Sequence, residues 1–210
     1  KPTVLILSAG STAMDMSSLF GEIPTGMIPL KQKPALRWII DNLVKDGFND
    51  FVISVGFKKE IIINYIGNLN IPNVKISCVE VDYKKSPGSS IKQISTTTNN
   101  VNGLLVVLGD TLVFESIDTS EDAVYTSKDF FYPDQFSTVT PDEENYVKDI
   151  KEKDKSKTTN DEALIGVYFF KNIDLLKKNF CEITDSSIQI SQILSLYCKK
   201  QKMKIHCTDS

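Results

Sequence analysis

The chain has 210 residues, and its 24 Lys and Arg against 27 Asp and Glu give a formal net charge of −3. Hydrophobic residues make up 41% and charged residues 24%, the composition of a globular protein and not of a disordered chain. No apolar run approaches the roughly 20 residues of a membrane-spanning helix, and a nucleic-acid binder normally has a basic face. We therefore expect one globular domain over residues 1–210, with no nucleic-acid and no membrane partner.

Histidine and cysteine, which often mark active sites, are scarce or scattered. His206 is the single histidine, which excludes mechanisms that need a histidine pair, such as most histidine-ligated zinc sites. No two of the four cysteines stand in a C-x-x-C spacing, and three lie in apolar or amphipathic segments. The sequence therefore predicts reduced, structural thiols and a cytoplasmic protein.

The first half of the chain alternates apolar segments with helical patterns. Predicted strands cover residues 3–7, 51–55, 74–81 and 104–108. A loop of small and polar residues is expected after the first strand, over residues 8–18. Predicted helices begin at Pro34 and end at Gly47, cover residues 59–66, and run to about Thr97 with Ser89 or Ser90 as the cap. This alternation is typical of an α/β fold with a mixed, mainly parallel sheet flanked by helices.

The second half is less regular. Strands are predicted at residues 123–126, 163–170 and 204–207, and a helix at about 187–199 with Asp185 as its cap. The stretch from residue 151 to 160 is highly charged, which predicts a solvated hairpin loop. Because the chain ends just after a strand, we expect residues 1–210 to be part of a longer protein.

The segment from Val4 to Thr12 carries the first chemical motif. A buried strand runs into a loop of small residues, where backbone N–H groups can face an anion. The spacing matches neither a Walker A loop nor a G-x-G-x-x-G fingerprint. On these residues alone, a tight turn that requires small side chains explains the pattern equally well.

Taken in chain order, six segments resemble the sugar nucleotidylyltransferases, also called nucleotide-sugar pyrophosphorylases. Leu7-Ser-Ala-Gly10 resembles the Leu-Ala-Ala-Gly that opens that family's sequences. The segment 29–40, which begins Pro-Leu-Lys-Gln-Lys-Pro, resembles the family's Pro-Val-x-Gly-Lys-Pro and the helix after it. Residues 47–56 resemble its Gly-x-x-x-x-x-Ile-Val-x-Gly strand.

Three later segments complete the resemblance. Pro87-Gly-Ser-Ser90 stands where the family has a Gly-Thr-Ala turn that recognises the base. Leu108-Gly-Asp110 resembles the metal-binding Gly-Asp at the end of a central strand, and residues 163–170 resemble the strand that lines the sugar pocket. The order and spacing of all six segments, over nearly the whole chain, carry the resemblance.

The resemblance implies a Rossmann-like fold of the nucleotide-diphospho-sugar transferase type. It also implies a reaction: a sugar-1-phosphate or similar phosphomonoester attacks the α-phosphate of a nucleoside triphosphate, and pyrophosphate leaves. Mg²⁺ is the implied cofactor, and polysaccharide synthesis is the implied use of the product. A homo-oligomer and a fusion to a further domain both remain open.

The resemblance also implies roles for residues that match the family's motifs. Asp110 is the implied metal ligand and a catalytic residue, and Gly88 is expected to let the base approach the backbone. The implied nucleotide-binding residues are Leu7, Ser8, Ala9, Gly10, Ser11, Pro87, Gly88 and Ser89. The implied contacts of the second substrate are Gly109, Asp110, Glu162 and Gly166.

Two positions depart from the family's pattern. Met14 stands where the family has an Arg that binds the triphosphate, and Thr25 stands where it has a catalytic Lys. A neutral side chain cannot offset negative charge in the transition state of phosphoryl transfer. Lys31 and Lys33 lie close in sequence, and Lys33 is the candidate catalytic cation; an exposed turn before the helix is the other interpretation.

Three functions follow from these matches and departures. The chain is an active nucleotidylyltransferase, or a catalytically silent relative that binds nucleotide or sugar phosphate, or a glycosyltransferase of the related single-sheet type. The third is disfavoured because Asp110-Thr-Leu-Val lacks the second Asp of an Asp-x-Asp motif. The family's second metal carboxylate falls at Asp209 at the earliest, or beyond Ser210.

Overall fold

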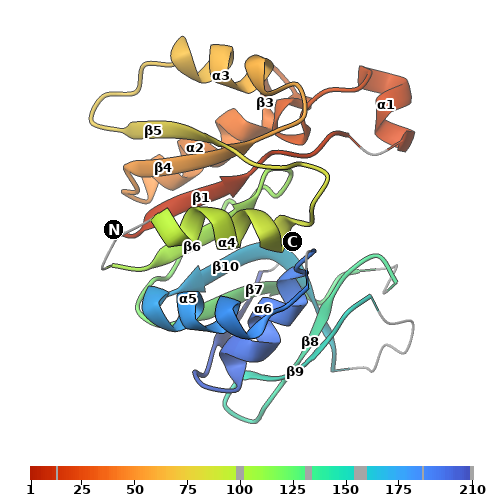
Figure 1. Ribbon diagram of the computed structural model, residues 1–210, viewed down its shortest axis with the longest axis vertical. Helices are drawn as coiled ribbons and strands as arrows, with labels where there is room; N and C mark the ends of the chain where they lie inside the picture. The colour runs from red at the N-terminus through yellow and green to blue at the C-terminus, as the bar shows by residue number, and fades with distance from the viewer. Residues whose placement is uncertain (13, 98–101, 131–133, 154–159, 186, 209–210) are drawn as a thin grey trace.

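The computed structural model describes residues 1–12, 14–97, 102–130, 134–153, 160–185 and 187–208 (Figure 1). Its centre is a mixed nine-stranded sheet whose main path runs β11-β7-β10-β6-β1-β4-β5. The parallel part of the sheet comprises β1 (Thr3–Leu7), β4 (Asp50–Val55), β5 (Lys75–Glu80) and β6 (Leu104–Leu108).

The remaining strands extend the sheet beyond β6. β10 (Glu162–Phe170) is antiparallel to β6 and to β7 (Ala123–Ser127), and β11 (Lys204–Cys207) is parallel to β7. A hairpin of β8 (Thr138–Pro141) and β9 (Val147–Lys151) pairs with the start of β10. β2 (Pro29–Leu30) and β3 (Lys33–Pro34) form a separate small sheet.

Helices cover both faces of the sheet and create two hydrophobic cores. Along β1, Leu5 and Leu7 pack into the core under α4 (Pro87–Thr97), α5 (Ile173–Glu182) and α6 (Ile190–Cys198). Val4 and Ile6 point to the opposite face, into the core under α2 (Ala35–Lys45) and α3 (Lys59–Gly67). Figure 1 shows α4, α5 and α6 in front of the sheet and α2 behind it. Both faces of β1 are buried, which explains why all its residues after Thr3 are aliphatic.

Every predicted strand is present, and the fold class is confirmed. α2 begins after Pro34 and is followed by Gly47 with φ +85°, as its sequence predicts. Residues 8–18 were expected to be a loop, whereas a short helix, α1 (Met14–Phe20), lies there. α5 and the β8–β9 hairpin were not predicted. Most of the charged stretch that follows β9 lies outside the described residues.

Two predicted helix starts are wrong. α4 begins at Pro87, so Ser89 and Ser90 lie in its first turn and do not precede it. α6 begins at Ile190, because Gln189 forms a reciprocal capping box with Gln192. The predicted cap, Asp185, instead accepts a hydrogen bond from the Gln192 side chain at 3.0 Å.

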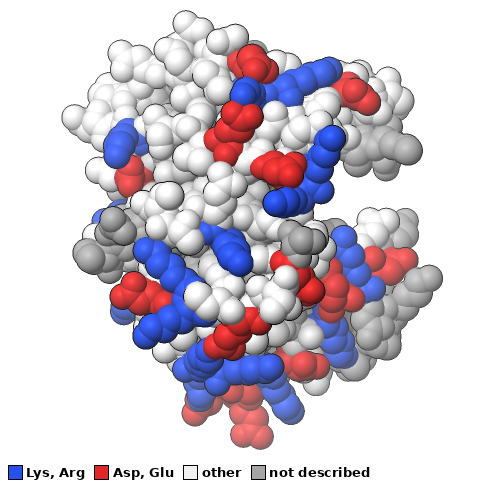
Figure 2. Space-filling model, viewed as in Figure 1, with Lys and Arg blue, Asp and Glu red and all other residues white. Residues whose placement is uncertain are grey.

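The order of the parallel strands positions the site. The chain passes from β1 to β4 and β5 on one side, then returns to place β6 on the other side of β1. The loops after β1 and β6 therefore leave the sheet in opposite directions, and such a switch point opens a crevice at the carboxyl ends of the strands. Figure 2 shows the molecule hollowed on the right, between the part that carries α1 and the part that carries β8 and β9.

No helix in the described part of the chain has both the length and the apolar character that crossing a membrane requires.

Candidate functional site

A cleft of about 290 Å³ lies at this switch point, and we call it the nucleotide cleft. Its walls come from the ends of β1, β4 and β6, from the short 3₁₀ helix η1 (Thr25–Met27), and from the connection between β5 and α4. The lining residues are Leu7, Ala9, Gly10, Thr25, Ser54, Tyr83, Lys85, Pro87, Ser90, Leu108, Gly109 and Asp110.

The loop after β1 is held from beneath by hydrogen bonds. Ser8 is fully buried: its backbone N–H donates to Ser54 Oγ at 3.2 Å, and its Oγ accepts from the N–H of Gly26 at 3.1 Å. The carbonyl of Gly10 accepts from both the N–H and the Oγ of Thr25, each at 3.1 Å. Ser8 thus fixes the loop against η1, and the cleft itself is lined by the two residues after it and by Leu7 before it. Ser11 is exposed and pairs with Pro24 in an isolated β-bridge.

The end of β6 brings a carboxylate to the same cleft. Gly109 donates its N–H to Leu7 O at 2.8 Å, and a Cβ on Gly109 would lie only 2.8 Å from that oxygen. The absence of a side chain therefore lets the ends of β1 and β6 come together. Asp110 follows as an exposed residue and is the one acidic side chain among the described residues that line the cleft.

The predicted base-recognition turn forms the first turn of α4. Pro87 lines the cleft, as does Ser90. Gly88 has a different reason to lack a side chain than the one predicted, because a Cβ there would lie 2.2 Å from Ile188 O. Ser89 likewise faces Ile188, whose N–H donates to Ser89 Oγ at 3.3 Å. The structure therefore places these two residues against the segment before α6.

Lys33, the predicted catalytic cation, forms an ion pair. Its Nζ is paired with Asp41 Oδ2 at 2.5 Å and lies 3.7 Å from the centre of the Trp38 ring. Asp41 also binds Arg37 at 2.7 Å, so the three charges form one group on α2 and the strand before it. Lys33 does not line the nucleotide cleft, and neither does Lys31. In this structure Lys33 is thus engaged by Asp41 and lies outside the lining of the cleft, and its role as the catalytic cation stays a prediction.

The cleft contains a cation that the sequence analysis missed. Lys85, from the connection between β5 and α4, is the one basic side chain among the described lining residues. Thr25, at the position of the family's Lys, does line the cleft but carries no charge. The side chain of Met14 lies outside what the structure describes. Only a Lys-Lys pair before Pro87 marks Lys85 in the sequence, and nothing local distinguishes it from other exposed lysines.

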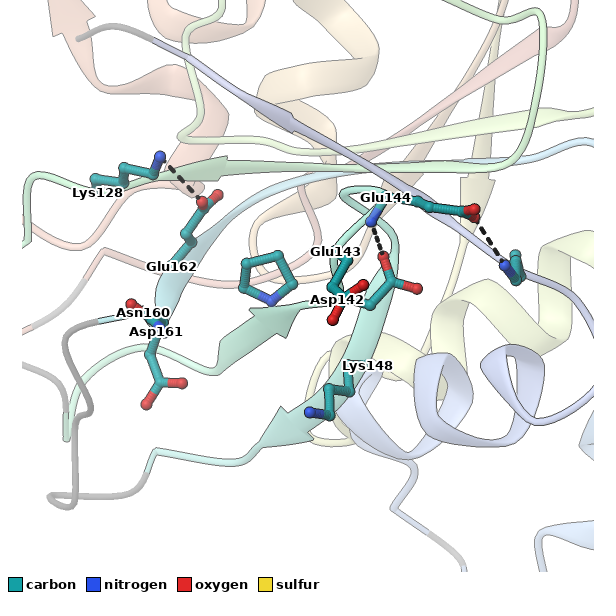
Figure 3. Close-up of a pocket in the computed structure, with 10 residues that line it drawn as sticks. Lys128, Asp142, Glu143, Glu144, Lys148, Asn160, Asp161 and Glu162 are labelled. Atoms are coloured by element: carbon teal, nitrogen blue, oxygen red, sulfur yellow. Dashed lines mark hydrogen bonds and ion pairs between the residues drawn. The ribbon is translucent and has the colours of Figure 1, made fainter.

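The residues implied to contact the second substrate separate into two places. Glu162 lines a larger cavity of about 890 Å³ (Figure 3), where its Oε2 accepts from Thr126 Oγ1 at 2.5 Å and its Oε1 lies 3.4 Å from Lys128 Nζ. Figure 3 shows Glu162 directed toward Lys128 and Asp161 directed away. This cavity is lined by Lys128, Pro141, Asp142, Glu143, Glu144, Lys148, Asn160, Asp161, Glu162 and Lys202.

Gly166 links the two places along β10. It has φ +89°, and a Cβ there would lie 2.6 Å from Leu108 Cδ1, so the bulged strand packs directly on the end of β6. Thr111 Oγ1 donates to Ile165 O at 2.7 Å and secures this contact. Glu162 lies four residues earlier, about 13 Å along an extended strand. β10 thus packs on Leu108, a residue of the nucleotide cleft, at one point and lines the larger cavity at another.

The donor set fits Mg²⁺ held jointly with a nucleotide. Asp110 offers hard carboxylate oxygens in the cleft, and Mg²⁺ is characteristically held by one or two carboxylates together with substrate phosphates. Among the described residues, no group of three or more His, Cys, Asp or Glu is placed to hold a metal. Asp209, the earliest position for a second ligand, lies outside the described residues.

Known proteins share both the sequence pattern and the fold. A guanylyltransferase for D-glycero-α-D-manno-heptose 1-phosphate from Campylobacter jejuni is 30% identical over 158 residues, 70% of this chain and 67% of that protein. Its counterpart from Aneurinibacillus thermoaerophilus is 30% identical over 107 residues, 51% of this chain and 46% of that protein. The chain thus spans about half the length of several curated relatives that it matches.

The structural comparisons agree. UDP-glucose pyrophosphorylase in complex with UDP-glucose superposes with a TM-score of 0.80 at 18% identity, covering 98% of this chain and 90% of that one. HddC from Yersinia pseudotuberculosis in complex with GMP-PN gives 0.71 at 19% identity, covering 99% and 91%. These likenesses establish the Rossmann-like nucleotide-diphospho-sugar transferase fold. Residues 3–210 match the family model for nucleotidyl transferases, and the chain therefore belongs to the nucleotidyl transferase family.

Proposed function

We propose that this chain binds a nucleoside triphosphate in the nucleotide cleft and transfers the nucleoside monophosphate to a sugar-1-phosphate or similar phosphomonoester. The observation that carries the proposal is that the Gly10 loop and Asp110 meet in one cleft at the switch point of the sheet. The guanylyltransferase names of two relatives support a nucleotidyl transfer to a sugar phosphate. We place this reaction in the cytoplasm.

In this reaction a phosphate oxygen of the acceptor attacks the α-phosphorus of the triphosphate. The new P–O bond forms as the bond to the bridging oxygen of the β-phosphate breaks, and pyrophosphate leaves with that electron pair. Such transfer depends on positioning and charge neutralisation. The backbone around Gly10 positions the triphosphate, and Asp110 would hold Mg²⁺, which would supply neutralisation of the charge on phosphate oxygens.

The acceptor's sugar belongs in the larger cavity that Glu162 lines. A buried carboxylate there can accept hydrogen bonds from sugar hydroxyls, and Thr126 and Lys128 hold it in place. Because β10 runs from Glu162 to the contact between Gly166 and Leu108, one strand positions the acceptor relative to the nucleotide.

A second candidate function is binding without transfer. Its supporting observation is the neutral Thr25 in the cleft, together with the pairing of Lys33 to Asp41. A silent relative of this kind would bind nucleotide or sugar phosphate and release no pyrophosphate.

A substrate panel separates the two functions. The purified chain, with Mg²⁺, is assayed for pyrophosphate release over five nucleoside triphosphates combined with several sugar-1-phosphates. Transfer predicts release that requires one triphosphate and one sugar phosphate together, and that falls at least 100-fold in Asp110→Asn. Glu115→Gln, which removes an exposed carboxylate outside the cleft, is the matched control and should retain activity. Triphosphate binding with no release from any pair would overturn transfer in favour of the silent function.

A further inference from the structure

The charge lining the nucleotide cleft is nearly balanced and depends on two side chains. Among the described lining residues, Lys85 is the one base and Asp110 the one acid. A nucleoside triphosphate carries several negative charges, and Mg²⁺ at Asp110 offsets only part of them. The loop after β1, where this chemistry usually has two cations, contributes Thr25 and no described positive charge. Among the described lining residues, Lys85 is therefore the one side chain that can offset the rest of this negative charge.

Three other lysines in this half of the chain are already engaged. Lys33 binds Asp41, Lys59 binds Glu80 at 2.6 Å, and Lys58 donates to the carbonyl of Glu22 at 2.7 Å. Lys85 is exposed, and within the described residues it forms no ion pair. Its ammonium group is therefore available to a ligand without breaking an existing contact.

The side chain of Lys85 can extend toward either of two cavities. It stands on the wall between the nucleotide cleft and a second cavity of about 420 Å³ over α4, which Asp82 and Asp185 line. Neither carboxylate is paired with Lys85 in the described structure. Occupation of the nucleotide cleft by an anion would draw the lysine to that side, because Coulomb attraction between unit charges is strong at a partly desolvated site.

The start of α4 favours an anion in the same place. Pro87 and Ser90, in the first turn of this 11-residue helix, line the cleft beside Lys85. The N-terminal end of a helix carries partial positive charge. The attraction of an anion by Lys85 therefore adds to its attraction by the N-terminal end of α4.

We propose that Lys85 supplies the positive charge for the nucleotide phosphates that positions 14 and 25 lack. The inference rests on the proposed function, since it assumes a nucleotide in this cleft. The positive charge then comes from the connection between β5 and α4 and not from the loop after β1. Lys85 is 60 residues from Thr25 in sequence, and both line the same cleft.

The test compares the affinity for a triphosphate with the affinity for its nucleoside. Calorimetry of the full chain with Mg²⁺ first identifies the tightest binder among GTP, UTP, CTP, ATP and dTTP. Lys85→Gln should weaken binding of that triphosphate about tenfold or more and leave binding of the nucleoside unchanged, because only the phosphates carry charge. Lys84→Gln removes a neighbouring exposed lysine that does not line the cleft, and should change the triphosphate affinity less than twofold.

A relocated charge gives an independent check. Thr25→Lys, introduced into Lys85→Gln, should recover most of the lost triphosphate affinity, because both positions line the same cleft. Melting curves check that each variant is folded. Lys85 is exposed, so we expect its replacement to leave the fold intact.

The outcomes separate this inference from the function on which it rests. If the wild-type chain binds a triphosphate but Lys85→Gln behaves as Lys84→Gln does, the inference is wrong and the proposed function stands. Equal losses of nucleoside and triphosphate affinity would also overturn the inference, since they would show that Lys85 contacts the nucleoside and not the phosphates. If the wild-type chain binds no triphosphate, the proposed function itself fails.

Discussion

Ser8 shows how a single residue can shape a binding loop from inside the protein. Its Oγ accepts from the N–H of Gly26, and a Cβ on Gly26 would lie only 2.3 Å from that oxygen. The sequence predicts a loop of small residues here, but a run of small residues does not reveal which way each one faces. The structure resolves this: Ser8 is turned toward η1, and Ala9 and Gly10 line the cleft.

Ser8→Ala should lower the free energy of unfolding by about 1–3 kcal/mol, because it leaves the buried N–H of Gly26 without its acceptor. Urea unfolding measures the change. Ser11→Ala is the matched control: Ser11 is exposed in the same loop, so the change there should stay within about 0.5 kcal/mol. Equal stability of the two variants would show that the Ser8 hydrogen bond does not hold the loop.

Gly166 is the second residue whose geometry the cleft requires. Its φ of +89° and the 2.6 Å distance from a built Cβ to Leu108 Cδ1 exclude a side chain for two separate reasons. Gly47 has a similar φ of +85°, but the nearest atom to its built Cβ is 3.9 Å away. An alanine at position 47 therefore suffers backbone strain alone, whereas one at position 166 suffers both strain and crowding.

Gly47→Ala should cost about 1 kcal/mol of stability, the penalty of a left-handed backbone for alanine. Gly166→Ala should cost more, and it should also weaken nucleotide binding because it displaces Leu108 at the cleft. Unfolding curves and calorimetry on both variants measure these effects. A smaller loss of stability at Gly166 than at Gly47 would contradict the proposed packing of β10 on β6.

Among the elements, the strands with a mainly aliphatic sequence were predicted best. β1 and β6 are central and buried on both faces, so β6 is wholly aliphatic and β1 is aliphatic after Thr3. The β8–β9 hairpin was missed because its strands do not alternate regularly between buried and exposed residues. The start of α6 was predicted too early because its N-cap is Gln189, which is not among the usual capping residues.

α5 was missed although its sequence contains a recognisable start. Asn172 precedes it and accepts a hydrogen bond from the N–H of Leu175 at 2.9 Å, and Ile173, Leu176 and Phe180 form its buried stripe. The apolar run of β10 ends just before Asn172 and obscured this boundary. A cap followed by spacings of three and four is the pattern that would have identified the helix.

Asn172→Ala should therefore reduce the free energy of unfolding by about 1 kcal/mol, the usual effect of removing a side-chain cap. Asn64→Ala, on the exposed side of α3, removes an asparagine within a helix and should leave stability unchanged or slightly raised, since alanine has the higher helix propensity. Chemical denaturation compares the two. Equal effects at both positions would show that the Asn172 hydrogen bond contributes nothing to α5.

At the scale of the whole molecule, charge is dispersed and the core is rich in buried tyrosine. Figure 2 shows basic and acidic side chains interspersed over the lower half of the view, with no large patch of one sign. Burial raises the pKa of Tyr125 to about 12, and it also raises the pKa values of Tyr168 and Tyr197. These groups stay neutral in the folded chain at pH values where the unfolded chain begins to ionise them.

Stability should consequently fall in alkali. An unfolded tyrosine has a pKa of about 10, so the stabilisation from a raised folded pKa is complete below that pH and is lost as pH rises toward the folded value. For each such tyrosine the slope is about 1.4 kcal/mol per pH unit. Urea unfolding at pH 8, 10 and 11 should show this loss, and Tyr125→Phe should make it shallower. An identical pH dependence in the variant would contradict the assignment of Tyr125.

The order of motifs along the chain was sufficient to predict the family and the fold. It could not show which charges meet in the cleft, because Lys85 and Thr25 are far apart in sequence and come together only through the strand order. The ion pair of Lys33 was not predicted for the same kind of reason: its partner, Asp41, lies eight residues later, on a helix that sequence spacing alone does not orient.

The central claim is that the cleft between β1 and β6 binds a nucleoside triphosphate with Mg²⁺. Calorimetric titration of the full chain with each triphosphate, with and without Mg²⁺, tests it most directly. The structure predicts one binding site per chain, affinity that rises with Mg²⁺, and loss of that rise in Asp110→Asn. The claim is contradicted if the folded chain binds no triphosphate, or if Asp110→Asn binds it as tightly and with the same response to Mg²⁺.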